Sequence, residues 1–328
     1  MVNIKTGKQD HVKKASQHIE RMLANQPEYV RGYYYHIKLD SKTESYGTHV
    51  QYINKVIRFL DYVNKPIEDI KMSDVERFMV DVSIKKNGEP VSGSYSVVIY
   101  SALKKFFDYL VGDEYISKSP MEKIGRPAPK KANQVERTFL TKSEVRKCFK
   151  AIDEGNANSI YKVRDKAILT ILFATGIRNT CLTEINVDNV DQENNCIYVI
   201  DKEDKAFTVW LNEENMETIR EWIKIRDMIM EEHPEEKALF ISRLGKRMGQ
   251  GATADVVKKA SKAIGHEITP HKARGTYCTL AYNDGIPLDI VSKLMHHSST
   301  KITVDCYLQG QEEKIREAGI KAARIVKL

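Results

Sequence analysis

The helical periodicity of this 328-residue chain stops between Pro120 and Arg137, and this interruption constrains the fold more than any other feature. In the segments from Tyr46 up to this point, apolar residues recur at steps of three and four positions, the pattern of helices with one buried face. Within the interruption, three prolines break any helix and five Lys or Arg residues make the segment basic. The sequence therefore predicts two folded parts joined by residues 119–138. This segment is either an exposed linker, which its composition favours, or a strap along a phosphate backbone.

The first part is predicted to be entirely helical. Tyr46–Val63 places its apolar residues on one face, and a second helix opens with a Ser-x-x-Glu capping box at Ser73. A third helix is expected over residues 94–111, again with one apolar side. Together these helices predict a small domain over residues 45–118. It follows an N-terminal lead, residues 1–44, whose helical pattern is irregular.

The second part, residues 139–328, is predicted to be mainly helical with a small antiparallel sheet. A Thr-x-x-Glu capping box at Thr141 starts its first helix. Two strands with alternating apolar residues, Asn195–Ile200 and Ala206–Leu211, are joined by a polar turn and predict a hairpin. A further strand is expected at 238–242, and further helices at 163–175, 213–232, 252–264, 270–283, 287–296 and 311–326.

Composition sets only broad limits on function. The formal net charge of +7 is compatible with a polyanionic partner, but it is spread over both parts and alone does not indicate one. The five cysteines are scattered, which fits reduced thiols better than a disulfide framework. The N-terminus lacks the apolar stretch of a signal peptide, and no apolar run approaches the ~20 residues of a membrane span. We therefore expect a soluble, cytoplasmic protein with no membrane association.

Five residues of the second part form the set with the most definite chemical meaning: Arg178, His271, Arg274, His297 and Tyr307. Arginine forks pair with phosphate oxygens, histidine moves protons near neutral pH, and tyrosine can act as a covalent nucleophile. Each residue alone is more often structural. Together they are the groups that transesterification at a phosphodiester needs when no metal takes part.

A metal site is the competing interpretation of His296, His297 and Cys306. Adjacent histidines point to different sides of a helix, and no carboxylate or second cysteine completes a common ligand set. The sequence therefore favours no metal site and no cofactor.

The order of these residues resembles the tyrosine recombinase (phage integrase) family across nearly the whole second part. The run Ala-Thr-Gly-Ile-Arg178 is similar to the family's first-arginine box, and 24 residues later Lys202 lies in the turn where the family keeps a catalytic lysine. Lys205 lies in the same turn and is the alternative. His271 and Arg274 have the family's His-x-x-Arg spacing.

The last two members of the set match as well, with some departures nearby. His297 follows Arg274 by 23 residues, in a His-His-Ser-Ser run similar to the family's Gly-His-Ser-Ser, and the tyrosine follows ten residues later. Cys181 stands where the family usually has an acidic residue that buttresses the pocket. Gly275 stands where many members have histidine, and His296 where a glycine is usual. These departures bear on rate or regulation rather than on the class of reaction.

The resemblance implies a role for each residue. Arg178 and Arg274 would bind the non-bridging oxygens of a phosphoryl centre that gains negative charge during attack, with His297 as a further donor. Tyr307 would attack and form a 3′-phosphotyrosyl bond, and His271 would move its proton. Lys202 would protonate the departing 5′-oxygen, so that it leaves as a hydroxyl. This chemistry needs neither ATP nor a metal.

The resemblance also implies an architecture and partners. The fold would be mainly α with a small antiparallel sheet in the catalytic domain, built as a two-domain C-shaped clamp on double-stranded DNA. The helical core-binding domain over 45–118 would precede the catalytic domain over 139–328. Protomers would bind inverted half-sites, form a homo-tetramer and exchange strands through a four-way junction. A C-terminal helix would dock on the neighbouring protomer.

Two other functions are compatible with parts of this pattern. A type IB topoisomerase uses similar chemistry to relax supercoils, and an accessory DNA-binding factor could keep the fold without catalysis. The helical first domain and the tail disfavour the topoisomerase, and the retained nucleophile and arginines disfavour the accessory factor. The basic residues expected to contact DNA are Lys104, Lys105, Lys123, Arg126, Lys130, Lys131, Arg137, Lys205, Arg243, Lys246, Arg247 and Lys272.

Overall fold

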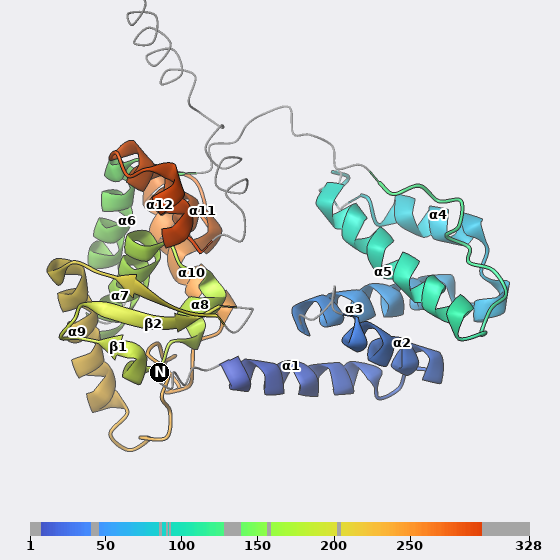
Figure 1. Ribbon diagram of the computed structural model, residues 1–328, viewed down its shortest axis with the longest axis horizontal. Helices are drawn as coiled ribbons and strands as arrows, with labels where there is room; N and C mark the ends of the chain where they lie inside the picture. The colour runs from blue at the N-terminus through green and yellow to red at the C-terminus, as the bar shows by residue number, and fades with distance from the viewer. Residues whose placement is uncertain are drawn as a thin grey trace, which may run out of the picture. The chain divides into compact units, whose positions relative to one another are not determined.

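The computed structural model describes residues 8–40, 46–84, 87–89, 91, 93–127, 139–155, 159–201 and 205–296. Several predictions from the sequence lie outside these ranges: Lys130, Lys131, Arg137, Lys202, His297, Tyr307 and the helix at 311–326. The chain forms two compact units, residues 9–133 and residues 134–328 with 1–8, and each is described by itself (Figure 1).

The first unit is helical, as predicted. Its elements are α1 (Lys8–Leu23), α2 (Glu28–Leu39), α3 (Tyr46–Val63), the 3₁₀ turn η2 (Ile67–Asp69), α4 (Met72–Asp81) and α5 (Gly93–Gly112). Pro27 precedes α2 and separates it from α1, which explains the irregular pattern of this region. Both helices contribute to the same core as α3–α5, so they pack within this unit. The boundaries at 44, 118 and 138 remain predictions.

The core of the first unit is rich in aromatic side chains. The rings of Phe59 and Phe78 meet edge to face at a centroid distance of 5.2 Å, and Phe59 and Phe107 do so at 5.7 Å. Tyr33 from α2 packs edge to face on Phe106 of α5. Edge-to-face pairs are a favoured geometry for aromatic rings and add to the stabilisation from buried area. This core packs α2–α5 into one bundle.

The start of α4 differs from the prediction. The helix begins at Met72 rather than after Ser73, and the backbone N–H of Lys71 donates to the Asp74 carboxylate at 3.0 Å. Lys65 also donates to Asp74, at 2.8 Å. The predicted capping box at Ser73 is therefore wrong, because a carboxylate that also binds a lysine caps the helix two residues earlier.

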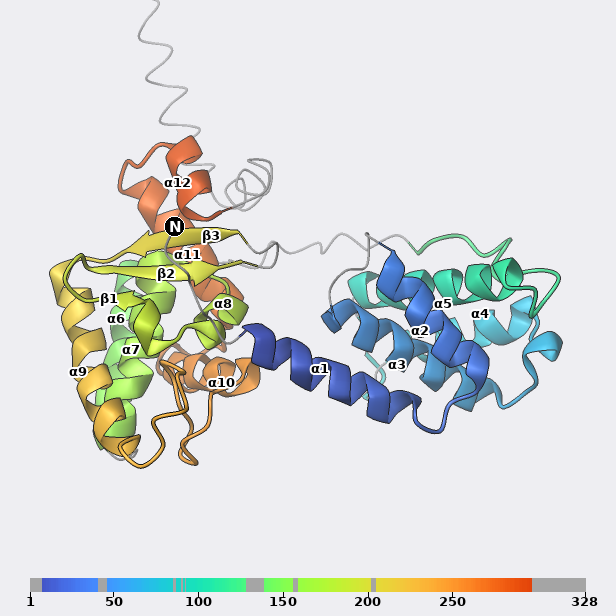
Figure 2. The ribbon, with the colours of Figure 1, turned by 60° about the horizontal axis from the view of Figure 1, so that its bottom comes forward.

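The second unit combines helices with one small sheet, as predicted. Its elements are α6 (Lys142–Glu154), α7 (Ser159–Thr175), α8 (Asn179–Glu184), η3 (Val187–Asn189), β1 (Val190–Asp191), β2 (Cys196–Ile200), β3 (Ala206–Trp210), α9 (Glu213–Ile229), α10 (Gln250–Ser261), η4 (Lys262–Ile264), α11 (Pro270–Asn283) and α12 (Leu288–Leu294). The antiparallel strands have the order β1-β2-β3, and Ile200 pairs with Ala206 at the end of the hairpin. In both ribbon views α8 lies near this end of the hairpin (Figures 1 and 2).

Helix α7 is the centre of the second unit. Five of its residues are fully buried at closely spaced positions, so the helix is enclosed rather than amphipathic: Ala167, Ile168, Leu169, Ile171 and Leu172. Trp222 of α9 is also buried in this core, and its indole N–H donates to the Leu239 carbonyl at 2.8 Å. The candidate site is built at the C-terminal end of α7.

Two details of the second unit test the sequence predictions. The capping box at Thr141 is confirmed, because its hydroxyl accepts from the Glu144 N–H and the Glu144 carboxylate accepts from the Thr141 N–H at 2.7 Å. The strand expected at 238–242 is wrong. Only isolated bridges form there, at Ala238 and Ile241, and the third strand of the sheet is instead β1. Among the described residues no helix is long and apolar enough to cross a membrane.

Candidate active site

The first arginine of the set follows the end of α7. Gly176 has a φ of +63°, a backbone conformation that favours glycine, and it turns the chain toward α8. A Cβ at this position would lie 2.5 Å from the ring of Tyr277 in α11, so the glycine also permits close approach of the two helices. Arg178 is then the N-cap residue of α8, and its carbonyl accepts from the Leu182 N–H at 3.0 Å.

The second arginine is anchored by backbone carbonyls. Thr269 caps α11, and Arg274 lies in the next turn with only 7% of its surface exposed. Its Nη1 donates to the Gly176 carbonyl at 2.6 Å, and its Nη2 donates to the Met295 carbonyl after α12. Burial and the positive charge of Arg178 lower the pKa of Arg274 to about 10, so the guanidinium remains charged at neutral pH. Three helix ends therefore meet around one buried cation.

Arg178 has a different partner, a carboxylate. Its Nη1 forms an ion pair with Oδ2 of Asp201, the residue that follows β2. Side-chain exposure is 33% for Arg178 and 17% for Asp201, so the pair is half-buried. The thiol of Cys181 lies 3.9 Å from the other oxygen of Asp201. Burial, and then the charge of Asp201, raise the pKa of Cys181 to about 11, so this side chain is a neutral thiol.

His296 lies near both arginines and Asp201. It has a φ of +48°, which explains why a glycine is usual at this place in the resembling family. Its ring lies on Phe207 of β3 with a centroid distance of 3.7 Å and an interplanar angle of 33°. Burial, and then the positive charge of Arg274, lower the pKa of His296. This histidine is the last described residue before His297.

The described part of the chain thus accounts for three of the six predicted catalytic residues. Arg178 and Arg274 lie close together at the end of α7, and the positive charge of Arg178 lowers the pKa of Arg274. His271 is exposed near the start of α11, three residues before Arg274. Lys202, His297 and Tyr307 lie outside the described residues. The structure places the two arginines in one neighbourhood, and the catalytic roles of all six residues remain predictions.

The predicted DNA-contact residues fall into two groups. Five of them are exposed: Lys123, Arg126, Lys205, Arg243 and Lys246. Lys104 and Lys105 are half-buried and pair with Asp108 and Asp40, and Lys272 is half-buried as well.

Arg247 does not fit the predicted DNA-contact role. Its side chain is only 5% exposed, and its guanidinium donates to the Thr183 carbonyl at 3.0 Å and to Asn186 at 2.6 Å. These contacts connect the segment before α10 to the end of α8. Arg247 therefore stabilises the fold, and we leave it out of the candidate interface.

Two functional candidates were missed by sequence reasoning. Asp201 is one, because its contact with Arg178 joins residues that are distant in sequence. The other is a basic cluster in the first unit, where Lys55 and Arg58 of α3 donate to the Tyr95 hydroxyl at 3.0 and 2.9 Å. Burial raises the pKa of Tyr95, but hydrogen bonds and charges from Lys55 and Arg58 outweigh it, so the pKa is lowered. The three-residue spacing of the two cations on α3 was the available signal.

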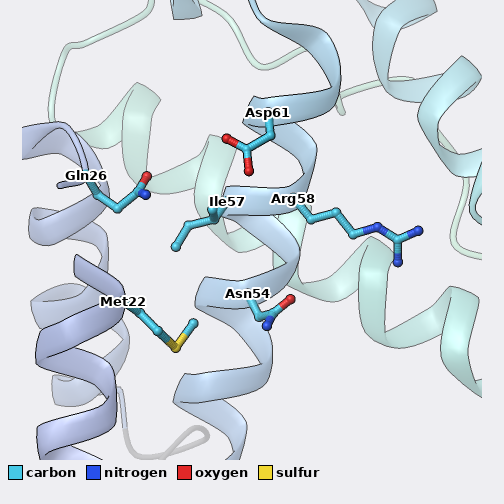
Figure 3. A pocket seen from close by; sticks show the side chains of 6 residues that line it. All are labelled: Met22, Gln26, Asn54, Ile57, Arg58 and Asp61. Atoms are coloured by element: carbon cyan, nitrogen blue, oxygen red, sulfur yellow. The ribbon is translucent and has the colours of Figure 1, made fainter. Parts of the chain in front are cut away.

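A pocket in the first unit lies beside this cluster, between α1 and α3 (Figure 3). It is lined by Met22, Gln26, Asn54, Ile57, Arg58 and Asp61. Arg58 extends away from the other labelled side chains (Figure 3). The lining is partly apolar and carries none of the predicted catalytic residues, so we assign no chemistry to it.

Comparison with known proteins decides the family. Residues 138–314 match the phage integrase family, and residues 36–117 match the phage integrase N-terminal SAM-like domain. The chain belongs to the phage integrase family. Members of this family are tyrosine recombinases, so this integrase-family protein is an enzyme that cuts and rejoins DNA at specific sites. The predicted family and enzyme class are confirmed.

Curated relatives of this integrase-family chain carry consistent names. It is 29% identical over 257 residues to tyrosine recombinase XerC of Caldanaerobacter subterraneus subsp. tengcongensis, which covers 77% of this chain and 68% of the relative. It is 26% identical over 291 residues to tyrosine recombinase XerC of Thermodesulfovibrio yellowstonii, which covers 86% of this chain and 91% of the relative. Both alignments extend well beyond the catalytic part.

Solved structures support the fold. XerH site-specific recombinase bound to palindromic difH substrate superimposes with a TM-score of 0.65 at 21% identity, covering 83% of this chain and 78% of that one. A lambda integrase tetramer bound to a Holliday junction gives a TM-score of 0.60 at 16% identity, covering 95% and 80%. The predicted fold class, a helical N-terminal domain followed by a mainly helical catalytic domain with a small sheet, is confirmed.

Proposed function

We propose that this recombinase cleaves DNA with Tyr307 and holds the scissile phosphate between Arg178 and Arg274. The hydroxyl would attack the phosphorus, form a 3′-phosphotyrosyl bond and release a 5′-hydroxyl. The phosphodiester bond is replaced by a phosphoester of tyrosine, so a second 5′-hydroxyl can reverse the step without ATP. The observation that carries the proposal is the meeting of two anchored guanidinium groups at the end of α7.

The two arginines suit a phosphoryl centre that gains charge during attack. Donors that are fixed before the reaction stabilise this charge without a reorganisation cost. Two N–H groups of Arg274 are used by the Gly176 and Met295 carbonyls, which fixes the guanidinium plane for its remaining donors. Arg178 is more exposed and its ion pair with Asp201 leaves its other N–H groups for phosphate oxygens. The pair would bind both non-bridging oxygens.

The proton transfers would involve histidine and lysine. His271 would take the phenol proton as Tyr307 attacks, and its exposed place on α11 supports access to DNA. His297 would add a donor to the phosphate. Lys202 would give a proton to the leaving 5′-oxygen, which departs as a hydroxyl, and Lys205, just before β3, is the alternative donor. His296, which lies near Arg178 and Arg274, is neutral because its pKa is lowered, so it adds no positive charge to the site.

The remaining predictions concern assembly. We propose that residues 45–118 and 139–328 form a C-shaped clamp around duplex DNA, joined by residues 119–138, and that protomers bind inverted half-sites. A homo-tetramer would exchange strands through a four-way junction, with the C-terminal helix docked on its neighbour. The support comes from relatives, since one solved structure is a lambda integrase tetramer bound to a Holliday junction. With DNA as its substrate, the protein would act in the cytoplasm.

The test uses a nicked duplex that traps the covalent intermediate. Inverted repeats beside the gene supply the candidate site, with half-sites of roughly one helical turn. The unaltered protein should form a denaturation-resistant adduct with one strand, and Tyr307→Phe should bind the same duplex without forming it. An adduct with Tyr307→Phe would contradict the assignment of the nucleophile.

The same assay separates the other functions. A topoisomerase would form the adduct and relax supercoiled DNA but leave two sites unexchanged. An accessory factor would bind the duplex and form no adduct under any condition. Strand exchange between two duplexes by the unaltered protein is the result that we expect.

A further inference from the structure

Asp201 lies just after β2 and is held in place by the β2–β3 hairpin. It follows directly after the last strand pair, Ile200 with Ala206, and its own N–H donates to the Lys205 carbonyl at 3.0 Å. The backbone of Asp201 is therefore positioned by the hydrogen-bond ladder of two strands. From this position it contacts Arg178 through one oxygen and lies near the Cys181 thiol with the other.

The negative charge next to Arg178 comes from the β2–β3 hairpin rather than from α8. Arg178 caps α8 and Cys181 is the third residue of the helix, so the two lie on one side, three positions apart. A carboxylate at 181 would therefore reach Arg178 from its own helix. The buried thiol stays neutral at pH 7 and supplies no such charge. Asp201 brings a negative charge to the same guanidinium from a different element.

We propose that Asp201 is a positioning residue that holds the guanidinium of Arg178 for the scissile phosphate, in place of an acidic side chain at position 181. This inference rests on the proposed function. The arginine side chain is long and flexible, and the carboxylate removes that freedom before DNA binds. The negative charge also offsets the repulsion between Arg178 and Arg274, since Asp201 raises the pKa of Arg274 where Arg178 lowers it.

The position of Asp201 has a second consequence. Lys202, the proposed proton donor, is the next residue in the chain. The ion pair therefore links Arg178 to the residue that directly precedes the lysine in the chain. Loss of the carboxylate should disturb the phosphate clamp, while the DNA contacts elsewhere on the protein stay unchanged.

The test compares single-turnover cleavage of the nicked duplex by the full chain and its variants. Asp201→Asn keeps the size and the hydrogen-bonding oxygen but removes the charge. We expect its cleavage rate at saturating DNA to fall by at least about tenfold, while its affinity for the duplex changes by less than about threefold. If Asp201 had only a structural role, the substitution would lower the melting temperature, and the cleavage rate would not fall separately from the affinity.

A charge swap gives the discriminating result. Asp201→Asn combined with Cys181→Asp should recover most of the lost rate, because the carboxylate then reaches Arg178 from α8. Cys181→Asp alone is the matched control. Its melting temperature shows whether the fold tolerates a carboxylate at position 181. Asp201→Glu is the conservative variant, and it should retain more activity than Asp201→Asn.

Three outcomes overturn the inference. Asp201→Asn that cleaves at the unaltered rate shows that the carboxylate does nothing for Arg178. A faster variant shows that Asp201 competes with the phosphate for the arginine. A swap that melts like the unaltered protein but recovers no activity shows that the two positions do not share one role. Adduct formation by the unaltered protein, run beside the variants, separates these outcomes from failure of the proposed function.

Discussion

The two arginines of the candidate site are held in different ways. Arg274 is buried where the ends of α7 and α12 meet α11, and two backbone carbonyls accept its hydrogen bonds. Arg178 lies at the more open end of the β2–β3 hairpin and is held by one side chain. The first region ties its arginine to backbone groups in a buried site, and the second holds its arginine through one half-buried ion pair. Removal of Arg274 should therefore affect stability and activity, and removal of Arg178 mainly activity.

The largest expected effect comes from Arg274→Ala. This substitution leaves the Gly176 and Met295 carbonyls without their donor in a buried site, and we expect it to lower the free energy of unfolding by about 3 kcal/mol. Arg178→Ala is the matched comparison. Its ion pair is partly exposed, so we expect a loss of less than about 1 kcal/mol. Denaturant unfolding of both variants measures the difference in the free energy of unfolding. Equal losses would show that the two arginines contribute alike to stability.

A smaller effect is expected from the turn that both arginines share. Gly176→Ala puts a methyl group against the Tyr277 ring and places alanine at a φ of +63°. We expect a loss of about 2 kcal/mol in the free energy of unfolding, from backbone strain and overpacking together. Because the Gly176 carbonyl holds Arg274, cleavage should fall as well. Gly265→Ala has a positive φ but nothing near its Cβ, so it is the control for backbone strain alone.

The smallest expected effect is a dependence of stability on pH at His296. The folded state keeps this imidazole neutral, since burial and the charge of Arg274 lower its pKa below the unfolded value of 6.5. Its contribution to stability is therefore present above about pH 6.5 and is lost as the pH falls through the lowered value. His296→Asn keeps a residue that tolerates positive φ and removes the titration.

Thermal unfolding of the unaltered protein and of His296→Asn between pH 7.5 and 5 checks this expectation. The melting temperature of the unaltered protein should fall more steeply below pH 6.5 than that of the variant. Parallel curves would show that the ring titrates alike in the folded and unfolded states.

Sequence reasoning was most successful where local pattern decides the structure. The capping box at Thr141 and the alternating hairpin strands formed as predicted, and the first-arginine box led to the end of α7. Helix periodicity depends on near neighbours along the chain, so one sequence is enough to predict it. Cap residues are less certain, because the box predicted at Ser73 is replaced by Asp74, which accepts from the Lys71 N–H.

The other failures have a common physical origin in contacts between distant residues. The segment at 238–242 is apolar like a strand, but it packs in the core as isolated bridges. Arg247 was expected at the surface, but it fills a cluster of carbonyls at the end of α8. The role of Asp201 depends on a hairpin that meets α8 only in the folded protein. None of these contacts has a signature in local sequence.

The most direct test of the phosphate clamp compares cleavage of two duplexes, one with the natural scissile phosphate and one with a neutral methylphosphonate there. If Arg178 stabilises charge on a non-bridging oxygen, Arg178→Ala should cost about 100-fold in rate on the phosphate and far less on the methylphosphonate. The same penalty on both duplexes would contradict the clamp and leave the arginine with a role away from the reacting centre.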